Sequence, residues 1–137
     1  MDARLSTFDQ SNALAMRNIE LFSDGSGGQC LLDVASHPFS AQFSFIFDTP
    51  TLAEFIQQLN AIYASLCGQA KLGQQHEDSY LLFQVNRQGH LTVSGQLNVS
   101  AEHWQNLKFS FSTDQSVLPS FISELEAVCG GQLCNSQ

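Results

Sequence analysis

The chain has 137 residues, of which 43% are hydrophobic and only 13% are charged, a composition typical of a folded domain and not of a disordered segment. Thirteen acids against five bases give a formal net charge of −8, which argues against nucleic-acid binding through a basic face. No apolar run approaches the roughly 18 residues of a membrane span, and the first ten residues do not resemble a signal peptide. We therefore expect a cytoplasmic protein that has neither a nucleic acid nor a membrane as its partner.

The first half of the chain predicts three strands followed by a helix. Residues before Asn18 suggest a short leading helix. In the last of the strands, phenylalanines alternate with polar residues, the pattern of a strand with one buried face. Asp48 or Thr49 then caps the helix, and Gly68 ends it. The predicted strands cover residues 18–24, 29–35 and 41–47.

The second half predicts the same plan. Asp114 is expected to cap its helix, and the glycine pair at 130–131 to end it. Pro119 is tolerated only in the first turn of a helix, which places the start near Asp114. The predicted strands cover residues 79–86, 90–99 and 107–112.

The two halves also share sequence. Residues 43–62 and 109–128 are identical at nine of twenty aligned positions, with an offset of 66. A weaker match at an offset of 61 aligns Leu21-Phe22 and Gly28 with Leu82-Phe83 and Gly89. The two offsets differ by five, which predicts five extra residues between the second and third strands of the second copy. We place them in a loop because loops tolerate insertions.

One such unit cannot bury both of its apolar faces, whereas two can. We therefore predict a single domain over residues 1–137, with repeat one at about 18–67 and repeat two at about 79–130. The expected fold is α+β with two layers: internally duplicated βββα units form one antiparallel sheet of about six strands, and both helices pack on one face of it.

Residues able to support catalysis or bind a metal are few. The four histidines (His37, His76, His90 and His103) lack the spacing of metal ligands, and the four cysteines contain no CxxC pair. Cys129 and Cys134 could form a disulfide only in an exported protein. Helix capping explains Asp48 and Asp114. We expect no catalytic, cofactor-binding or metal-binding residues and no enzymatic activity.

Partner binding is the remaining role. Acidic side chains with few bases to offset them suit a basic protein surface, although they also simply aid solubility. The only tryptophan lies in the segment inserted into the second copy, and tryptophan is common at binding hot spots. The candidate partner-binding residues are Glu77, Asp78, Glu102, Trp104, Glu20, Asp24 and Asp33.

Several motifs resemble the WapI family of bacterial immunity proteins. These motifs lie between Ile62 and Leu118, and they determine the fold without forming a contact site. Thr113-Asp114-Gln115 is followed by Ser116 where members of the family have threonine. The motifs read, in order, IYASLCGQAKL, an acidic pair at 77–78, YLLF, GHLTVSG and FSFSTDQSVL.

This resemblance implies a small antitoxin that binds a secreted bacterial toxin domain, often a nuclease, and neutralises it stoichiometrically. The partner would then be the cognate toxin, and the antitoxin itself a monomer or a weak homodimer that needs no cofactor. A small acidic secretion chaperone, which holds an effector protein, is the alternative. Such chaperones usually act as homodimers, and the internal repeat weakly opposes that alternative.

Overall fold

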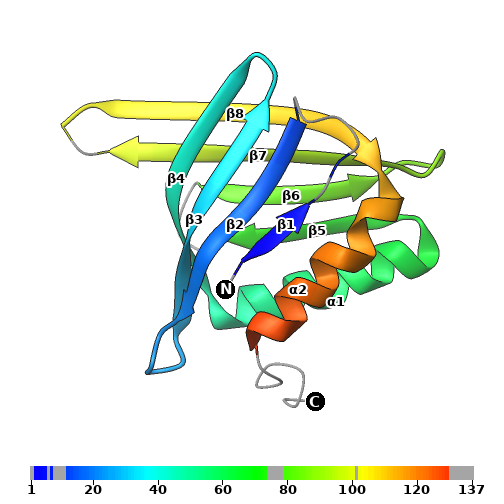
Figure 1. Cartoon of the computed structure of the whole chain (residues 1–137), viewed down its shortest axis with the longest axis horizontal. Helices are drawn as coiled ribbons and strands as arrows, with labels where there is room; N and C mark the ends of the chain where they lie inside the picture. The colour runs from blue at the N-terminus through cyan, green and yellow to red at the C-terminus, as the bar shows by residue number, and fades with distance from the viewer. Residues whose placement is uncertain (1, 6, 8–11, 74–78, 101, 130–137) are drawn as a thin grey trace.

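Eight strands form two separate antiparallel sheets in the computed structural model, which describes residues 2–5, 7, 12–73, 79–100 and 102–129 (Figure 1). Sheet A has the order β1-β2-β3-β4 and sheet B the order β5-β6-β7-β8. Sheet A comprises β1 (Ala3–Leu5), β2 (Asn12–Leu21), β3 (Gly27–Ser36) and β4 (Phe39–Asp48), and is followed by helix α1 (Thr49–Ser65). Sheet B comprises β5 (Gly68–Gly73), β6 (Tyr80–Val85), β7 (His90–Ser100) and β8 (Trp104–Asp114), and is followed by a 3-10 turn, η1 (Gln115–Val117), and helix α2 (Leu118–Cys129).

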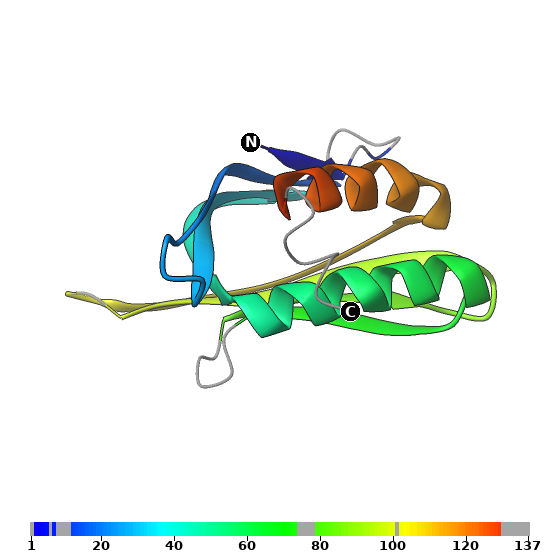
Figure 2. The same ribbon diagram turned by 90° about the horizontal axis from the view of Figure 1, so that it is seen from below.

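The α+β class is confirmed, but the prediction of one sheet of about six strands is wrong. Each half begins with a strand that the sequence analysis missed, β1 in the first half and β5 in the second. Strand β5 turns back along α1 instead of continuing sheet A. The second half therefore starts its own sheet, and both helices lie beside each other at one end of the space between the sheets (Figure 2).

The leading helix expected before Asn18 is also wrong, because β2 already begins at Asn12. Leu14 and Met16 are buried at alternate positions, and the next buried residue is Ile19. A bulge between Arg17 and Glu20, with Asn18 at a φ of 52°, shifts the alternation by one residue. The bulge hides the strand period in the sequence.

The strand registers define how the two halves correspond. Gly27 pairs with Asp48 at the open end of the β3–β4 hairpin, as His90 pairs with Asp114 in β7–β8. The second hairpin is therefore 25 residues long and the first 22, a difference of three residues and not the expected five. The weaker sequence match is not structural, since Leu21 ends β2 whereas Leu82 lies in the middle of β6.

Phe83 of β6 joins the two helices in a single buried cluster. Its ring meets that of Phe55 on α1 edge-on, with the centroids 5.4 Å apart, and stacks on that of Phe121 on α2 at 5.5 Å. All three side chains are fully buried. Helix α1 runs along β5 and α2 along β1, so the helix of each half contacts an outer strand of the other half's sheet.

The two helix starts differ in how they are capped. The Asp114 carboxylate accepts a hydrogen bond from the backbone N–H of Ser116 at 2.8 Å. It thus caps the 3-10 turn η1 and not α2 itself, which begins four residues later than expected, at Leu118. Asp48 occupies the N-cap position of α1, but its side chain makes no capping hydrogen bond. The backbone N–H of Thr49 donates instead to the Ser26 carbonyl at 3.1 Å, which ties the start of α1 to the β2–β3 turn.

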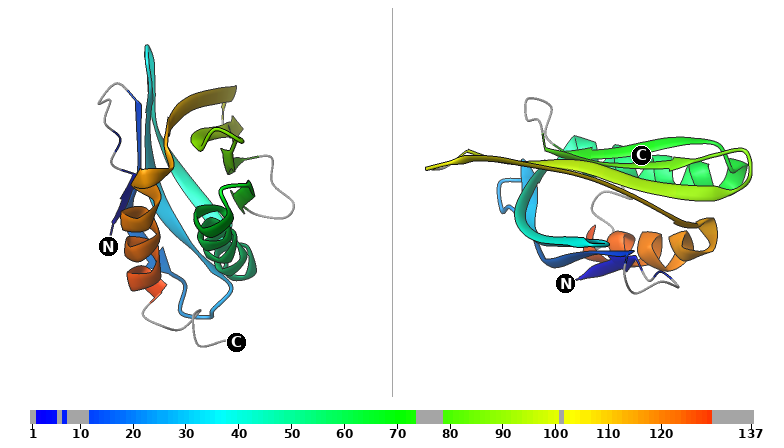
Figure 3. Two further views of the ribbon diagram at one scale, coloured as in Figure 1. Left: turned by 90° about the vertical axis from the view of Figure 1, so that its right-hand side faces the viewer. Right: turned by 90° about the horizontal axis from the view of Figure 1, so that it is seen from above.

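The sheets cross where the β3–β4 hairpin meets β8. The hydroxyl of Ser36 donates to the Ser110 carbonyl at 3.3 Å. Beyond this crossing each hairpin projects separately, β3–β4 in one direction and β7–β8 in another (Figure 3). The longer β7–β8 hairpin therefore reaches past β4, the outer strand of sheet A.

Candidate functional site

Asp24 lies at the tip of the β2–β3 turn, where its carboxylate holds the turn together. The backbone N–H of Ser26 donates to it at 3.0 Å and the Ser26 hydroxyl at 2.7 Å. These two bonds hold the pKa of Asp24 below its ordinary value, so the side chain stays charged at neutral pH. The Thr49 hydroxyl donates to the Gly25 carbonyl at 2.9 Å, so the start of α1 fixes the turn.

Other acids surround this turn. Glu20 is exposed on β2 just before it, and Asp48 is paired with Gly27 just after it. We call Glu20, Asp24 and Asp48 the acidic end. Its charges come from two strands and a turn that the start of α1 holds in place, so it presents a fixed negative surface.

Asp33 lies elsewhere, on the outer face of sheet A. Its carboxylate is 3.4 Å from the guanidinium of Arg17, and both side chains are partly exposed. A similar exposed pair joins Arg4 to Asp2 at 3.6 Å. A hollow of about 610 Å³ lies between these pairs, over a floor formed by the alanines Ala13, Ala15 and Ala35. Asp33 is therefore not a free acid, because it is paired with Arg17.

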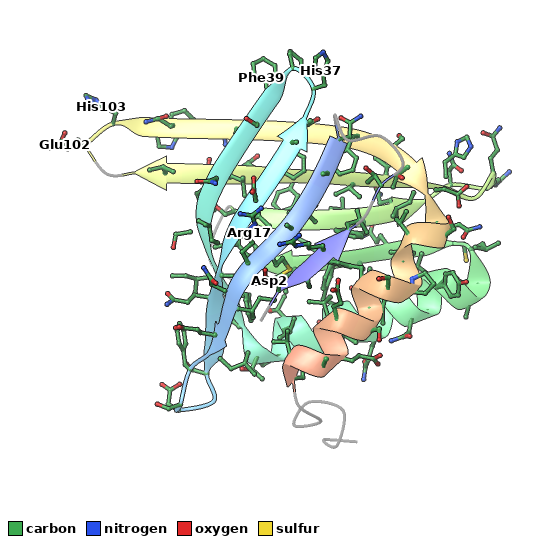
Figure 4. All side chains as sticks on the ribbon, viewed as in Figure 1. Asp2, Arg17, His37, Phe39, Glu102 and His103 are labelled. Atoms are coloured by element: carbon green, nitrogen blue, oxygen red, sulfur yellow. The ribbon has the colours of Figure 1, made fainter. Side chains whose placement is uncertain are left out.

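Glu102 and Trp104 lie at the tip of the β7–β8 hairpin (Figure 4). The side chain of Trp104 is 71% exposed, so the tryptophan does not cover a sheet end and can act as an anchor for a partner. Glu77 and Asp78 fall outside the described residues. The described candidates are thus divided among the acidic end, the outer face of sheet A and the β7–β8 tip.

A groove that the sequence analysis missed lies beside this tip. It has a volume of about 330 Å³ and runs between β4 and the β7–β8 hairpin, so it could only be found once the two hairpins were placed in space. Apolar side chains form much of it, and amide side chains contribute at its rim. We call it the β4 groove; it is lined by residues 40–43, Leu97, Val99 and residues 105–107.

The histidines and cysteines form no reactive centre in the described part of the chain. His37 and His103 lie at the tips of different hairpins (Figure 4), and no group of three metal-binding side chains occurs among the described residues. Burial raises the pKa of Cys30 to about 12, so its thiol is not a nucleophile at neutral pH. Cys129 is buried and Cys67 exposed, while His76 and Cys134 lie outside the described residues.

Comparison with known proteins gives a family and a fold. The family model described as the immunity protein WapI-like family matches residues 7–130. No curated protein sequence matches the chain significantly. A chain of the Trypanosoma brucei MRP1/MRP2 crystal structures has a similar fold, with a TM-score of 0.56 and 9% sequence identity over 100% of this chain and 87% of that one. In the part of the chain that the structure describes, no helix is both long and apolar enough to cross a bilayer.

Proposed function

The chain belongs to the immunity protein WapI-like family, and from this membership we infer that it is an antitoxin that binds a bacterial toxin domain and blocks its activity. The match over residues 7–130 is the observation that carries the proposal. Because it spans both helices and every described strand except β1, nearly the whole fold is implicated, and not one motif alone.

Inhibition by this antitoxin is stoichiometric and needs no catalysis or cofactor. It acts in the cytoplasm on its cognate toxin, and we propose nucleases as the first class of toxin to test. The antitoxin occludes the toxin as a monomer.

Electrostatic attraction brings the partners together. The net charge of −8 and the fixed acidic end attract a toxin with a basic surface. Long-range attraction of this kind mainly raises the association rate. Glu102 at the β7–β8 tip and the pair Glu77-Asp78 add to the same negative field.

Co-expression tests the proposal. The gene immediately upstream is read first, and if it encodes a large secreted protein with a variable C-terminal domain, that domain is the probe. Expressed alone in a heterologous bacterium it should stop growth, and expressed with this chain it should not. With purified proteins, toxin activity should fall linearly and reach zero at one antitoxin per toxin. Complete inhibition far below equal amounts would point to an enzyme, and continued killing would contradict the antitoxin role.

A further inference from the structure

The inner face of the β7–β8 hairpin is apolar. Sheet A packs on this face near its middle but not towards the tip, so the apolar side chains there are more exposed. On β7, Leu97 is buried, whereas Val99 at the next inward position is 40% exposed. On β8, Phe109 is buried and Leu107 is only partly buried. The cover ends at β4, because β4 is the last strand of sheet A and the longer hairpin continues beyond it. The β4 groove is the resulting uncovered corner.

The edge of β4 that borders this groove is open for strand pairing. β4 pairs with β3 at ten consecutive positions and, among the described residues, with no strand on its other side. Proteins usually protect such an edge with a charge, a proline or a bulge. From Phe39 to Phe47 the strand has none of these, and its first charge is Asp48.

The other outer strands are better protected. β1 has only three residues, β5 lies along α1, and the Ser36 hydroxyl contacts β8 at Ser110. The edge of β4 is thus a long unprotected template, and it lies beside a groove whose floor is partly apolar.

We propose that β4 accepts an extended segment of the toxin as a fifth strand of sheet A, and that the inward side chains of this segment fill the β4 groove. The proposal rests on the antitoxin function proposed above. Main-chain hydrogen bonds to β4 provide the pairing, and a pocket for alternate side chains provides selectivity. The added strand packs over Val99 and Leu107 near the tip of the β7–β8 hairpin. Strand β4 packs in the same way over the part of the hairpin where Leu97 and Phe109 are buried.

The groove also predicts the chemistry of the segment. Side chains at alternate positions must be apolar, because they meet Phe43, Leu97 and Val99. At the rim, Gln42 and Gln105 offer uncharged donors and acceptors. Among the described residues no charged side chain lines the groove, so the inward side chains of the inserted segment are apolar and uncharged, and the acids act elsewhere on the toxin.

A second copy of this chain fits the groove poorly. Its β4 strand would have to present a free inner face, yet Phe43 on that face already lines the same groove with Leu97 and Leu107 of its own chain. The β7–β8 hairpins of two such copies would occupy the same space. An incoming strand must bring no hairpin of its own, as a loop or a terminal segment of a partner does.

A heptapeptide library displayed on phage tests this site without any toxin. Peptides selected on the purified protein should alternate apolar and polar residues. In NMR titrations, the strongest synthetic peptide should shift the amides of residues 39–43 and 97–107. Val99→Lys, in the groove floor, should weaken its binding at least about tenfold, as expected when an interface centre is made charged. Ala41→Arg, which fills the groove from the β4 side, should do the same.

Ile46→Lys is the matched control, because Ile46 lies on β4 with 43% exposure, close to the value for Val99, but does not line the groove. It should bind the peptide within about twofold of the wild type, since isolated surface changes have small effects. Circular dichroism should show that all three variants fold. Failure to select such peptides, shifts elsewhere, or full binding by Val99→Lys would overturn the proposal.

The toxin assay then separates the two proposals. Loss of protection with Val99→Lys but not with Ile46→Lys supports strand addition. Equal protection by both variants overturns strand addition and leaves the antitoxin role intact, whereas no protection by the wild type rejects the antitoxin role itself. Sedimentation of the free protein should give a monomer, and a dimer that Val99→Lys disrupts would identify a second copy as the occupant and overturn the proposal.

Discussion

Phe83 stacks on Phe121 with the ring planes inclined by only 14° and the centroids 5.5 Å apart. The first residue lies on sheet B and the second on the last helix, and the other edge of the same cluster is formed by Phe55 on α1. The ring of Phe83 therefore links the two halves of the chain, because it contacts Phe55 of the first half and Phe121 of the second. Aromatic pairs of this kind contribute roughly 0.5–1.5 kcal/mol beyond the burial of their area.

Removing either helical ring should therefore destabilise the whole fold. Phe55→Ala and Phe121→Ala should each lower the free energy of unfolding by about 3–5 kcal/mol, because each leaves a large cavity. Phe39→Ala, at a phenylalanine that is 66% exposed, should change it by less than about 0.5 kcal/mol. Chemical denaturation measures all three, and a loss below about 1 kcal/mol for a helical variant would contradict the shared core.

Gly95 should not tolerate a side chain. An added Cβ would lie 2.7 Å from the Tyr80 carbonyl oxygen and 2.8 Å from the ring of Phe109. The backbone atom cannot move without breaking the β6–β7 pairing, so Gly95→Ala should cost about 1–3 kcal/mol of unfolding free energy, as overpacked sites do. Ser112→Ala, at an exposed position on β8, is the control and should be nearly neutral in the same denaturation experiment.

The cap of η1 should make stability depend on pH. Hydrogen bonds from Ser116 lower the pKa of Asp114 in the folded protein, and the nearby His90 adds a smaller effect. A lowered folded pKa means that this stabilisation is present above the ordinary value of about 3.9 and is lost as the pH falls through the folded pKa. Asp114→Asn keeps an acceptor for the Ser116 N–H but cannot titrate.

The Tm of wild-type protein and of Asp114→Asn should therefore differ most at pH 6 and converge towards pH 2.5, because acid removes the charge only from the wild type. Ser112→Ala, on the same strand, should follow the wild type across this range. A constant difference between wild type and Asp114→Asn at all pH values would show that the charge of Asp114 contributes nothing to stability.

Thiol reactivity should divide the cysteines by burial. Cys67 is exposed, whereas Cys30 and Cys129 are buried. A variant with Cys67→Ser and Cys134→Ser should react slowly with a disulfide reagent at pH 8 and quickly after denaturation, because the pKa of Cys30 is about 12 in the folded state. Rapid reaction of this folded variant would mean that one of the two buried thiols is accessible.

The electrostatic contribution to toxin binding can be measured apart from the groove. The association rate should fall steeply with salt, as the screening length shrinks from about 30 Å at 0.01 M to about 3 Å at 1 M. Glu20→Lys and Glu102→Lys should slow association at low salt with little change in dissociation. An association rate that does not change with salt concentration, with both variants still protecting cells, would show that the acids do not contribute to toxin binding. It would leave the proposal for the β4 groove unaffected.

The sequence predicted the two helices and the strands β6, β7 and β8 well, since their patterns are regular. Leu52, Phe55 and Leu59 repeat at helical spacing on α1, and Leu91 and Val93 alternate on β7. β2 was hidden because alanines stand at its outward positions and a bulge at Asn18 breaks its period. β5 is short, exposed at its start and bounded by glycines, so no local signal marks it.

Only part of the candidate site could be predicted from the sequence. Exposed acids and a lone tryptophan can be recognised from residue types, and Trp104 is indeed exposed. The pairing of Asp33 with Arg17 and the meeting of Phe43 with Leu97 join residues from different strands or different sheets. Such contacts depend on strand order and on the angle between sheets, which single-sequence patterns do not encode.

The contact between the first strand and the last helix has a consequence for synthesis. The backbone N–H of Arg4 donates to the Glu124 carboxylate at 2.9 Å, and α2 runs along β1. The ribosome makes β1 before α2, which packs against it. The β1 edge of sheet A therefore has no helix beside it until residue 129 has left the exit tunnel. A nascent chain stalled before α2 should therefore stay sensitive to protease at its amino-terminal end, while the released chain becomes resistant.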